Sequence, residues 1–489
     1  MNRYQSVSTP SLTASFRDPS GCLIKTEKEI LRIVSKAGRA ELELFLASAT
    51  AKKYLEMGSV VQTEFLEEAE IHSLLNKNEI RNLFDTLDGN TLVKHEKVLF
   101  ASFPYEWPVE MLHTAATLTL DLAESLISEG LGLKDATPYN ILFRGPAAVF
   151  VDLLSFEQRA PTDPIWLACA QFERTFLLPL LMNKYFGLTL TELFIVRRDG
   201  IEPEEIYRMA GLLRRLMPPF LTMVSLPVWL TAKHNQEQTG IYQQRSLNNP
   251  EKARFILESS FKRLRHLLEQ LAPKSDLKSS WSDYISSNNY SEEHFKAKTT
   301  FVEQAIAELS PGKILDVGCN TGHFSAIAAR SGATVVAIDS DPVVVGKAWR
   351  RAISEHLDIL PLVIDLSRPS PSIGWRNREC ASFLERARGA FDAILMLAVV
   401  HHLLVSERIP LPEIIDLVSE LTTDILIIEY IAPNDSMFRK ITRGREHLFE
   451  YFTREFFENI CAGHFNIVRV QHLNQTERWL YLLRKRKGM

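Results

Sequence analysis

The chain has 489 residues, of which 46% are hydrophobic and 24% charged, with a formal net charge of -4. The length predicts two domains, and the near-neutral charge disfavours nucleic acid as a partner. Five scattered cysteines without a CxxC pair argue against a disulfide framework and against structural zinc. A polar N-terminus and the lack of a long apolar run predict a cytoplasmic protein with no membrane span.

The N-terminal domain is expected to span residues 1–272 and to be of the α+β class. One motif in it contains residue types that take part in catalysis or metal binding: the segment LKDATPYNILF is followed by VFVDLLSFE. Asn140 lies shortly after Asp135, and Asp152 stands at the end of the next apolar strand. This spacing brings two carboxylates and an amide to the end of a predicted hairpin.

The motif resembles the catalytic lobe of protein kinases and small-molecule phosphotransferases, where an Asp orients the attacking hydroxyl and an Asn and an Asp hold magnesium. Asn140 and Asp152 would then be metal ligands only if the domain is an active phosphotransferase. Leu133 departs from the family pattern, Leu-Leu follows Asp152, and no Gly-rich loop precedes the motif. An active phosphotransferase, a degenerate scaffold and a simple hairpin loop stay open; the departures favour the degenerate scaffold.

A change of composition marks the domain boundary. Residues 250–271 have helical periodicity, and residues 273–300 are rich in Ser, Asn and Lys, which predicts a linker. The second domain is expected to span residues 301–489. Its first element is predicted to be a short amphipathic helix at 301–309.

The second domain alternates between apolar strands and helices. Strands that are apolar on both faces are typical of a parallel sheet covered by helices, so we predict a doubly wound, mostly parallel α/β domain. The predicted strands are 313–318, 334–339, 360–365, 391–397 and 424–430, with helices at 323–332 and 343–356. An antiparallel pair, 465–473 and 478–485, is predicted at the sheet edge.

The loop after the first of these strands, in LDVGCNTGHFS, indicates a nucleotide site. Gly318 and Gly322 let the backbone turn sharply and approach a ligand, and amides of the following helix point at it. Asn320 replaces the second glycine of a dinucleotide fingerprint, and Asp316 precedes the first, so NAD is disfavoured. The loop alone is also consistent with a tight turn that binds nothing.

Two further aspartates strengthen the nucleotide interpretation. Asp339 ends the second strand, where a carboxylate can accept hydrogen bonds from both ribose hydroxyls. Asp365 ends the third strand, where an adenine would lie. Ligands bind at the carboxyl ends of strands in open α/β sheets, so an Asp at the end of three consecutive strands predicts a site there.

The segments DVGCNTG, AIDSDP, VIDLSRP and FDAILMLAVVHHL resemble, in order, the motifs of class I S-adenosylmethionine (SAM)-dependent methyltransferases. The resemblance covers about residues 300–489 and implies a Rossmann-like methyltransferase fold with SAM as cofactor. The residues that it places around SAM, from the amino-acid end through the ribose to the adenine, are Asp316, Gly318, Asn320, Gly322, Asp339, Asp365 and Leu366.

The acceptor side is less clearly marked. His401 and His402 follow the fourth strand and are the catalytic candidates, since a histidine there can take a proton from a hydroxyl or amine. A histidine that packs or caps a helix start is the interpretation we favour. Glu429 and Tyr430 are expected to line the acceptor site. Residues 436–453 are expected either to cover the cleft or to form a solvated helix.

Nearly the whole chain resembles a bacterial family of two-part methyltransferase-like proteins, some described as nodulation proteins, through FRDPSG, YEWP, DATPYN, VDLLSFE, DPIW and WSDY. The resemblance implies that both parts belong together. The sequence therefore predicts methyl transfer from SAM to a small-molecule or saccharide acceptor. The alternatives are a phosphotransferase with an appended SAM domain and a non-catalytic SAM-binding scaffold.

Overall fold

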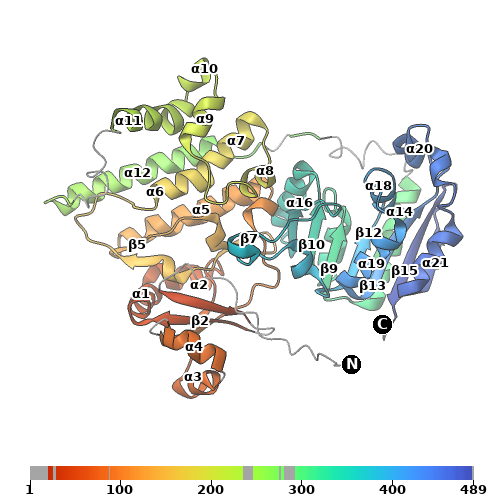
Figure 1. The fold of residues 1–489 in the computed structure, drawn as a ribbon, viewed down its shortest axis with the longest axis horizontal. Coiled ribbons are helices and arrows are strands. Elements are labelled where there is room, and N and C mark those ends of the chain that lie inside the picture. The colour runs from red at the N-terminus through yellow and green to blue at the C-terminus, as the bar shows by residue number, and fades with distance from the viewer. Residues whose placement is uncertain are drawn as a thin grey trace.

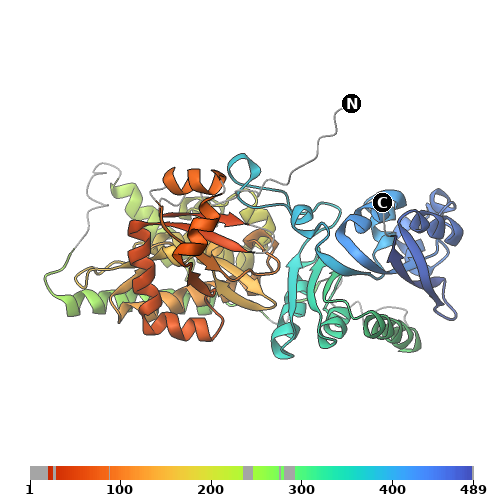
Figure 2. The ribbon, with the colours of Figure 1, turned by 90° about the horizontal axis from the view of Figure 1, so that it is seen from below.

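A computed structural model describes residues 20–25, 29–76, 78–86, 89–234, 246–274, 277–279 and 292–486. The chain forms an N-terminal part (residues 20–274) and a C-terminal part (residues 292–486), which lie side by side (Figures 1 and 2). The WSDY segment, half of the predicted linker and most of FRDPSG lie outside the described residues.

The N-terminal part begins with a four-stranded antiparallel sheet of order β1-β2-β4-β3. Its strands are β1 (Gly21–Lys25), β2 (Ile30–Ser35), β3 (Thr63–Phe65) and β4 (Gly89–His95). The helices around it are α1 (Lys36–Ala47), α2 (Ala49–Glu56), α3 (Glu68–Leu75) and α4 (Asn78–Thr86). Because side chains alternate along a strand, one sheet face packs on α3 and α4 and the other faces the rest of this part.

The remainder of the N-terminal part is mainly helical. It includes the hairpin β6 (Ile141–Arg144) and β7 (Ala147–Phe150), and β5 (Leu131–Leu133) pairs with β8 (Phe156–Gln158). The helices are α5 (Val109–Ile127), α6 (Cys169–Phe172), α7 (Leu178–Phe186), α8 (Leu190–Phe194), α9 (Pro203–Met209), α10 (Leu212–Arg215), α11 (Leu226–His234) and α12 (Pro250–Gln270). Short helical turns are η1 (Pro104–Glu106), η2 (Pro138–Asn140), η3 (Leu153–Ser155), η4 (Glu173–Leu177) and η5 (Leu221–Ser225).

The C-terminal part is built on a seven-stranded sheet of order β11-β10-β9-β12-β13-β15-β14. The strands are β9 (Lys313–Val317), β10 (Thr334–Asp339), β11 (Ile359–Val363), β12 (Phe391–Met396), β13 (Thr422–Ile431), β14 (Phe465–His472) and β15 (Arg478–Lys485). The first five are parallel, and β15 and β14 form the predicted antiparallel edge. The predicted doubly wound, mostly parallel α/β fold is confirmed.

Helices cover both faces of this sheet. The helices are α14 (Glu292–Leu309), α15 (His323–Arg330), α16 (Pro342–Ser354), α17 (Phe383–Ala387), α18 (Val400–Val405), α19 (Leu411–Leu421), α20 (Ser436–Thr442) and α21 (Arg454–His464), with the turns η6 (Trp375–Asn377) and η7 (Glu446–Phe449). One face shares a core with α14 and α15, and the other with α17, α18, α19 and α21. Apolar runs on both strand faces follow from this double cover.

Most element boundaries differ from the sequence-based expectation by one or two residues, and two differences bear on the site. Helix α14 begins at Glu292, so the last residues of the predicted linker are helical. The reason is tertiary packing: the Phe295 ring lies against His323, and Lys298 is buried beside Glu429. Strand β11 ends at Val363, so Asp365 lies in the loop after the strand and does not end it.

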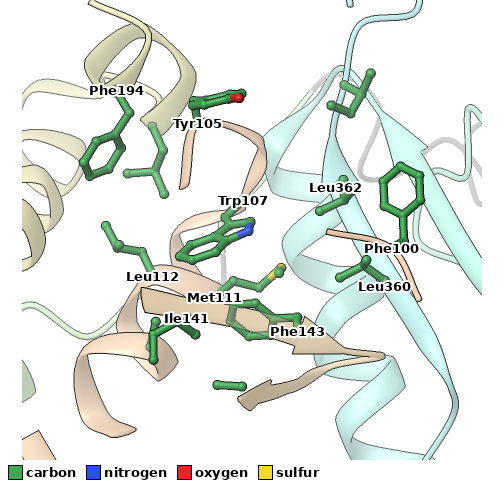
Figure 3. Packing of buried hydrophobic residues seen from close by; sticks show 14 of the residues in the cluster. Phe100, Tyr105, Trp107, Met111, Leu112, Ile141, Phe143, Phe194, Leu360 and Leu362 are labelled. Atoms are coloured by element: carbon green, nitrogen blue, oxygen red, sulfur yellow. The ribbon is translucent and has the colours of Figure 1, made fainter. Parts of the chain in front are cut away.

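The two parts share one apolar core. Trp107, Met111 and Phe143 of the N-terminal part belong to the same buried cluster as Leu360 and Leu362 of β11 (Figure 3). The side chains of these residues lie between η1, α5, β6 and the outer strand of the large sheet. The contact between the two parts (hereafter the seam) is therefore a continuation of the protein interior.

Buried charges cross the seam as well. Arg386 donates to the Glu106 carboxylate, which also accepts a hydrogen bond from Ser370. Arg350 donates to Glu110 at 2.5 Å. The side chains of Glu106 and Arg386 are both at most 5% exposed, so each depends on the other to compensate its charge.

In the part of the chain that the structure describes, no helix is long and apolar enough to cross a lipid bilayer.

Candidate functional site

The order of the large sheet sets β9 beside β12, although β10 and β11 come between them in the sequence. The chain runs outward from β9 to β11 and then returns to β12, so this is the topological switch point where ligands bind in open α/β sheets. The loops on its two sides touch: a Cβ on Gly318 would lie 2.5 Å from Cγ2 of Val399. Gly318 also has a positive φ of 71°, so a side chain is disfavoured here by space and by backbone conformation.

The glycine loop is held by backbone bonds to the neighbouring strand. The amides of Gly318 and Cys319 both donate to the carbonyl oxygen of Ile338, at 2.8 and 3.0 Å. Asn320 and Gly322 have positive φ values of 50° and 75°. These turns bring the chain directly into α15, whose first-turn amides have no partners within the helix. Such amides suit a negatively charged group.

Asp316 lies beneath this loop and is 3% exposed. Its carboxylate accepts a 2.5 Å hydrogen bond from the Ser325 hydroxyl of α15. Burial raises the pKa of Asp316 to about 6; the Ser325 bond opposes that rise and the nearby Asp339 adds to it. The residue therefore joins β9 to α15 at the base of the predicted amino-acid end of the site.

Asp339 stands at the end of β10, beside the loop. Its two carboxylate oxygens accept hydrogen bonds from the amides of Asn320 and Asp341, each at 3.0 Å. Burial raises the pKa of Asp339 to about 6, against the effect of these amides. The carboxylate is thus oriented by the backbone of the loops that follow β9 and β10.

Asp365 and Leu366 follow β11 on the same edge of the sheet. Asp365 accepts hydrogen bonds from the amide and hydroxyl of Ser367 and pairs with Arg368 at 2.9 Å. Burial would raise the pKa of Asp365, but the bonds from Ser367 and Arg368 outweigh it, and the pKa lies below its ordinary value. Leu366 is 8% exposed and supplies an apolar surface next to this carboxylate. The three predicted aspartates therefore lie at or just beyond the carboxyl ends of three neighbouring strands, Asp316 in β9, Asp339 at the end of β10 and Asp365 in the loop after β11.

His401 and His402 lie in α18 on the other side of the switch point. His401 is 2% exposed, its ring is 4.1 Å from that of His402, and it stacks on Phe438 at 6.4 Å. Burial, followed by the neighbouring His402, places the pKa of His401 far below its ordinary value. His402 is only partly buried, and burial lowers its pKa too. His401 is therefore buried in the packing around Phe438, and His402 is the more accessible of the two; the catalytic role of either histidine stays a prediction.

A buried charge network that the sequence did not suggest lies next to these histidines. Lys298 of α14 donates to Glu429 of β13 at 2.6 Å, and Arg478 of β15 lies 3.8 Å from the same carboxylate. Arg478 also makes a two-pronged contact with Asp435, at 2.8 and 3.0 Å. A charged residue within a long apolar strand, such as Glu429, is the signal that could have revealed it.

The charge network also holds helix α20, which follows β13, in place. Asp435 accepts a hydrogen bond from the amide of Met437 at 2.8 Å and so caps α20. Phe438 of α20 is fully buried against His401. Helix α20 therefore packs on α18, while the Tyr430 hydroxyl donates to the Phe452 carbonyl and belongs to the core. The expectation that Tyr430 lines the acceptor site is thus not met by its position.

The motif of the N-terminal part forms a second polar cluster. Asn140 donates to the Asp135 carbonyl at 3.2 Å and to the Ser155 hydroxyl at 3.1 Å, and Ser155 donates to Asp152 at 2.8 Å. The structure therefore brings Asn140 and Asp152 together, as their spacing predicted. Arg32 of β2, which the sequence did not single out, pairs with Asp152 at 2.6 Å.

This cluster is held by internal contacts. Burial would raise the pKa of Asp152, but Arg32 and Ser155 outweigh it and lower the pKa. Gln171 donates to the Asp135 carboxylate at 2.5 Å. Among the described residues, no group of three His, Cys, Asp or Glu side chains is placed to hold a metal ion. The kinase-like interpretation stays a prediction.

Comparison with known proteins gives one family match and one relative along nearly the whole chain. The family model described as "Methyltransferase domain" matches residues 258–475. The nodulation protein NoeA of Rhizobium meliloti (strain 1021) is 28% identical over 472 residues, which cover 96% of this chain and 95% of that protein.

Solved structures with similarity to the chain include the N-methyltransferase NodS from Bradyrhizobium japonicum WM9. It has 16% identity and a TM-score of 0.30, and the alignment covers 40% of this chain and 97% of NodS. The bifunctional kinase-methyltransferase WbdD has 18% identity and a TM-score of 0.30, over 43% of this chain and 44% of WbdD. The family match spans the glycine loop and all three aspartates. The C-terminal part of the chain is a SAM-dependent methyltransferase domain.

Proposed function

We propose that SAM binds across the carboxyl ends of β9, β10 and β11, and that its methyl group passes to a small-molecule or saccharide acceptor on the β12 side of the switch point. The observation that carries this proposal is the orientation of Asp339 at the switch-point edge. A carboxylate has about four acceptor positions, and the amides of Asn320 and Asp341 use only part of them. The rest suit the two hydroxyls of a ribose.

The neighbouring residues fit the remainder of SAM. Gly318 and Gly322 allow the backbone and the α15 amides to approach the amino-acid end, with Asp316 beneath them. Leu366 offers an apolar surface for the adenine, with Asp365 at its rim. SAM supplies an electrophilic methyl group on a sulfonium, so the domain has mainly to align the acceptor with that methyl group and exclude water.

The acceptor would lie between α18 and the cover formed by residues 436–449. A neutral imidazole can accept a proton from an attacking hydroxyl, and the lowered pKa of His402 keeps it neutral near pH 7. We assign this role to His402. His401, which is buried against Phe438, would instead position the loop after β12.

The cofactor assignment is tested by calorimetric titration of the full chain with SAM. The Asp339→Ala variant should bind SAM at least about tenfold more weakly, because two charge-assisted hydrogen bonds to the ribose are lost. Asp358→Ala is the matched control, since Asp358 is an exposed carboxylate at the opposite end of the same sheet. Equal SAM affinity in wild type and Asp339→Ala would refute the ribose assignment.

The acceptor class is tested with labelled SAM and whole-cell extract, which is fractionated after the reaction into small molecules, saccharides, protein and nucleic acid. Label should appear in a small-molecule or saccharide fraction, and His402→Gln should slow its transfer by about 10²-fold or more while SAM affinity is retained. Label found only in protein or nucleic acid would contradict the proposed acceptor class.

A further inference from the structure

Exposed apolar side chains are concentrated on α9, α10 and α11 and their connections. The segment between residues 209 and 230 exposes eight large apolar side chains, and Leu212 and Leu213 are 77% and 81% exposed. They are Met209, Leu212, Leu213, Leu216, Met217, Leu226, Trp229 and Leu230. We call this group the 209–230 surface. An apolar surface of this kind indicates contact with a partner or a membrane.

The charge of the same segment has one sign. Between Ile206 and His234 the sequence contains no Asp or Glu, but it contains Arg208, Arg214 and Arg215. None of these arginines pairs with a carboxylate among the described residues. Of the acidic residues just before the segment, Glu202 pairs with Arg174 and Glu205 with Arg197, while Glu204 lies one helical turn before Arg208, which donates to its backbone carbonyl.

The surface is held rigidly on the protein. Arg215 lies over the Tyr207 ring at 4.0 Å and donates to the carbonyls of Tyr207 and Ala210. The Trp229 indole donates to the Tyr207 hydroxyl at 3.1 Å. These contacts join α9, α10 and α11, and α10 lies at the outer extremity of the N-terminal part (Figure 1). The exposed leucines are thus the side chains that would meet a flat surface first.

The apolar and basic side chains of the 209–230 surface favour a membrane over a second copy of the chain as binding partner. A second copy packed on it about a twofold axis would bring the same arginines together, with no carboxylate in the segment to compensate them. An anionic bilayer instead offers hydrocarbon for Leu, Met and Trp side chains and phosphates for arginines. Leucines at the tip, with Arg208 and Arg214 beside them, match this arrangement.

We propose that the 209–230 surface docks the protein on an anionic lipid membrane, with α10 inserted at the level of the headgroups. This property goes beyond methyl transfer and is independent of it. It would bring the methyltransferase domain close to acceptors that reside in or on a membrane.

The test is co-sedimentation of the full-length protein with vesicles. The protein should sediment with vesicles of equal parts phosphatidylcholine and phosphatidylglycerol, and at least about tenfold less with pure phosphatidylcholine. Replacing both leucines (Leu212→Ser, Leu213→Ser) should reduce the partition coefficient at least about tenfold. Replacing Arg208 and Arg214 with Gln should also weaken binding at least about tenfold and flatten its salt dependence.

The matched control replaces Leu44 and Met57 with Ser, since both are exposed apolar residues elsewhere on the N-terminal part. This variant should bind vesicles as wild type does. All variants are first titrated with SAM, so a folding defect is recognised independently. Absence of sedimentation with anionic vesicles, or equal sedimentation of the leucine variant, would overturn the proposal. A wild-type dimer that the leucine substitutions dissociate, without vesicle binding, would assign the surface to a second copy.

Discussion

At the scale of single residues, the SAM edge is unusual in burying carboxylates close together. Asp316 is inaccessible to solvent and lies near Asp339, and each has a pKa raised to about 6, chiefly by burial. Such groups are typical of functional sites, because a fold would not otherwise retain carboxylates that it desolvates. The polar ligand that we propose there gives them a purpose.

Asp316 makes the stability of the protein without SAM dependent on pH. The raised pKa means that the Asp316 carboxyl binds its proton more tightly in the folded protein than in the unfolded chain. Proton binding therefore stabilises the folded protein fully below about pH 4, and this stabilisation is lost as the pH rises through about 6. Asp316→Asn stays neutral and can still accept the Ser325 hydrogen bond. Wild type loses this stabilisation between pH 4 and pH 7, whereas the variant does not. The unfolding free energy of Asp316→Asn minus that of wild type should therefore rise by on the order of 3 kcal/mol over this pH range.

The measurement is urea unfolding of both proteins across that pH range. Asp392→Asn serves as control, because Asp392 is a partly exposed carboxylate at the amino end of β12 that accepts hydrogen bonds from the Gly312 and Lys313 amides. A difference between Asp316→Asn and wild type that does not vary with pH would contradict the raised pKa.

At the residue scale, the sequence predicts positions on the sheet where spacing and strand location carry the information. Asp316, Asp339 and Asp365 could be placed along one edge because each belongs to or follows an apolar run, and parallel strands bring their carboxyl ends to one edge; their role in binding stays a prediction. Arg32 and Lys298 were missed, because each acquires its meaning from a partner more than a hundred positions away in the sequence. Only the folded chain brings those partners together.

At the scale of elements, the short helix α20 depends on a charged residue of strand β15, Arg478, which pairs with the residue that caps the helix. Asp435 caps its first turn and pairs with Arg478 of β15, and both residues are at most 8% exposed. Helices this short have little stability of their own, so tertiary contacts hold them in place. Helix α20 is therefore anchored through β15.

Removing the Asp435 carboxylate should destabilise the protein strongly. Asp435→Ala leaves Arg478 without its main partner and α20 without its cap, with an expected loss of about 3–5 kcal/mol in unfolding free energy. Glu420→Ala is the control, since Glu420 pairs with Arg388 on the surface and should contribute at most about 1 kcal/mol. Denaturant unfolding measures both. Similar small losses in the two variants would show that the buried pair does not anchor α20.

Element prediction was accurate for the large sheet and less so at its borders. Strands such as β10 and β12 are continuous apolar runs because helices cover both their faces, and that pattern is visible locally. The start of α14 was not visible, because its first turns are polar and are ordered by contacts of Phe295 and Lys298. The arrangement of the N-terminal strands, from β1 to β4, was not predicted either, since it depends on pairing between distant segments.

At the scale of the whole molecule, the seam makes the two parts interdependent. Trp107 and Phe143 share a core with β11, and Glu106 compensates Arg386 inside it. Arg386 follows the loop that begins at Asp365, so the N-terminal part supports the adenine side of the proposed SAM site.

The expected consequence is one cooperative unfolding transition for the full chain in scanning calorimetry. Glu106→Gln leaves a buried guanidinium uncompensated and should lower the transition temperature by several degrees, from a loss of about 3–5 kcal/mol. Glu96→Gln, which breaks an exposed pair with Arg144, should leave it nearly unchanged. Two separate transitions in wild type, with neither altered by Glu106→Gln, would be incompatible with a shared core.

The seam also restricts how such a chain can be inherited. Recombination between residues 273 and 300 would join this N-terminal part, with Glu106 and Glu110, to the C-terminal part of another protein. Where that part lacks the counterparts of Arg350 and Arg386, the two carboxylates lose their ion-pair partners. Each unmatched charge would then lie in an apolar interior, and most chimeras would fail to fold. The two parts are expected to pass from genome to genome as a single unit, and substitutions on one side should be followed by compensating substitutions on the other.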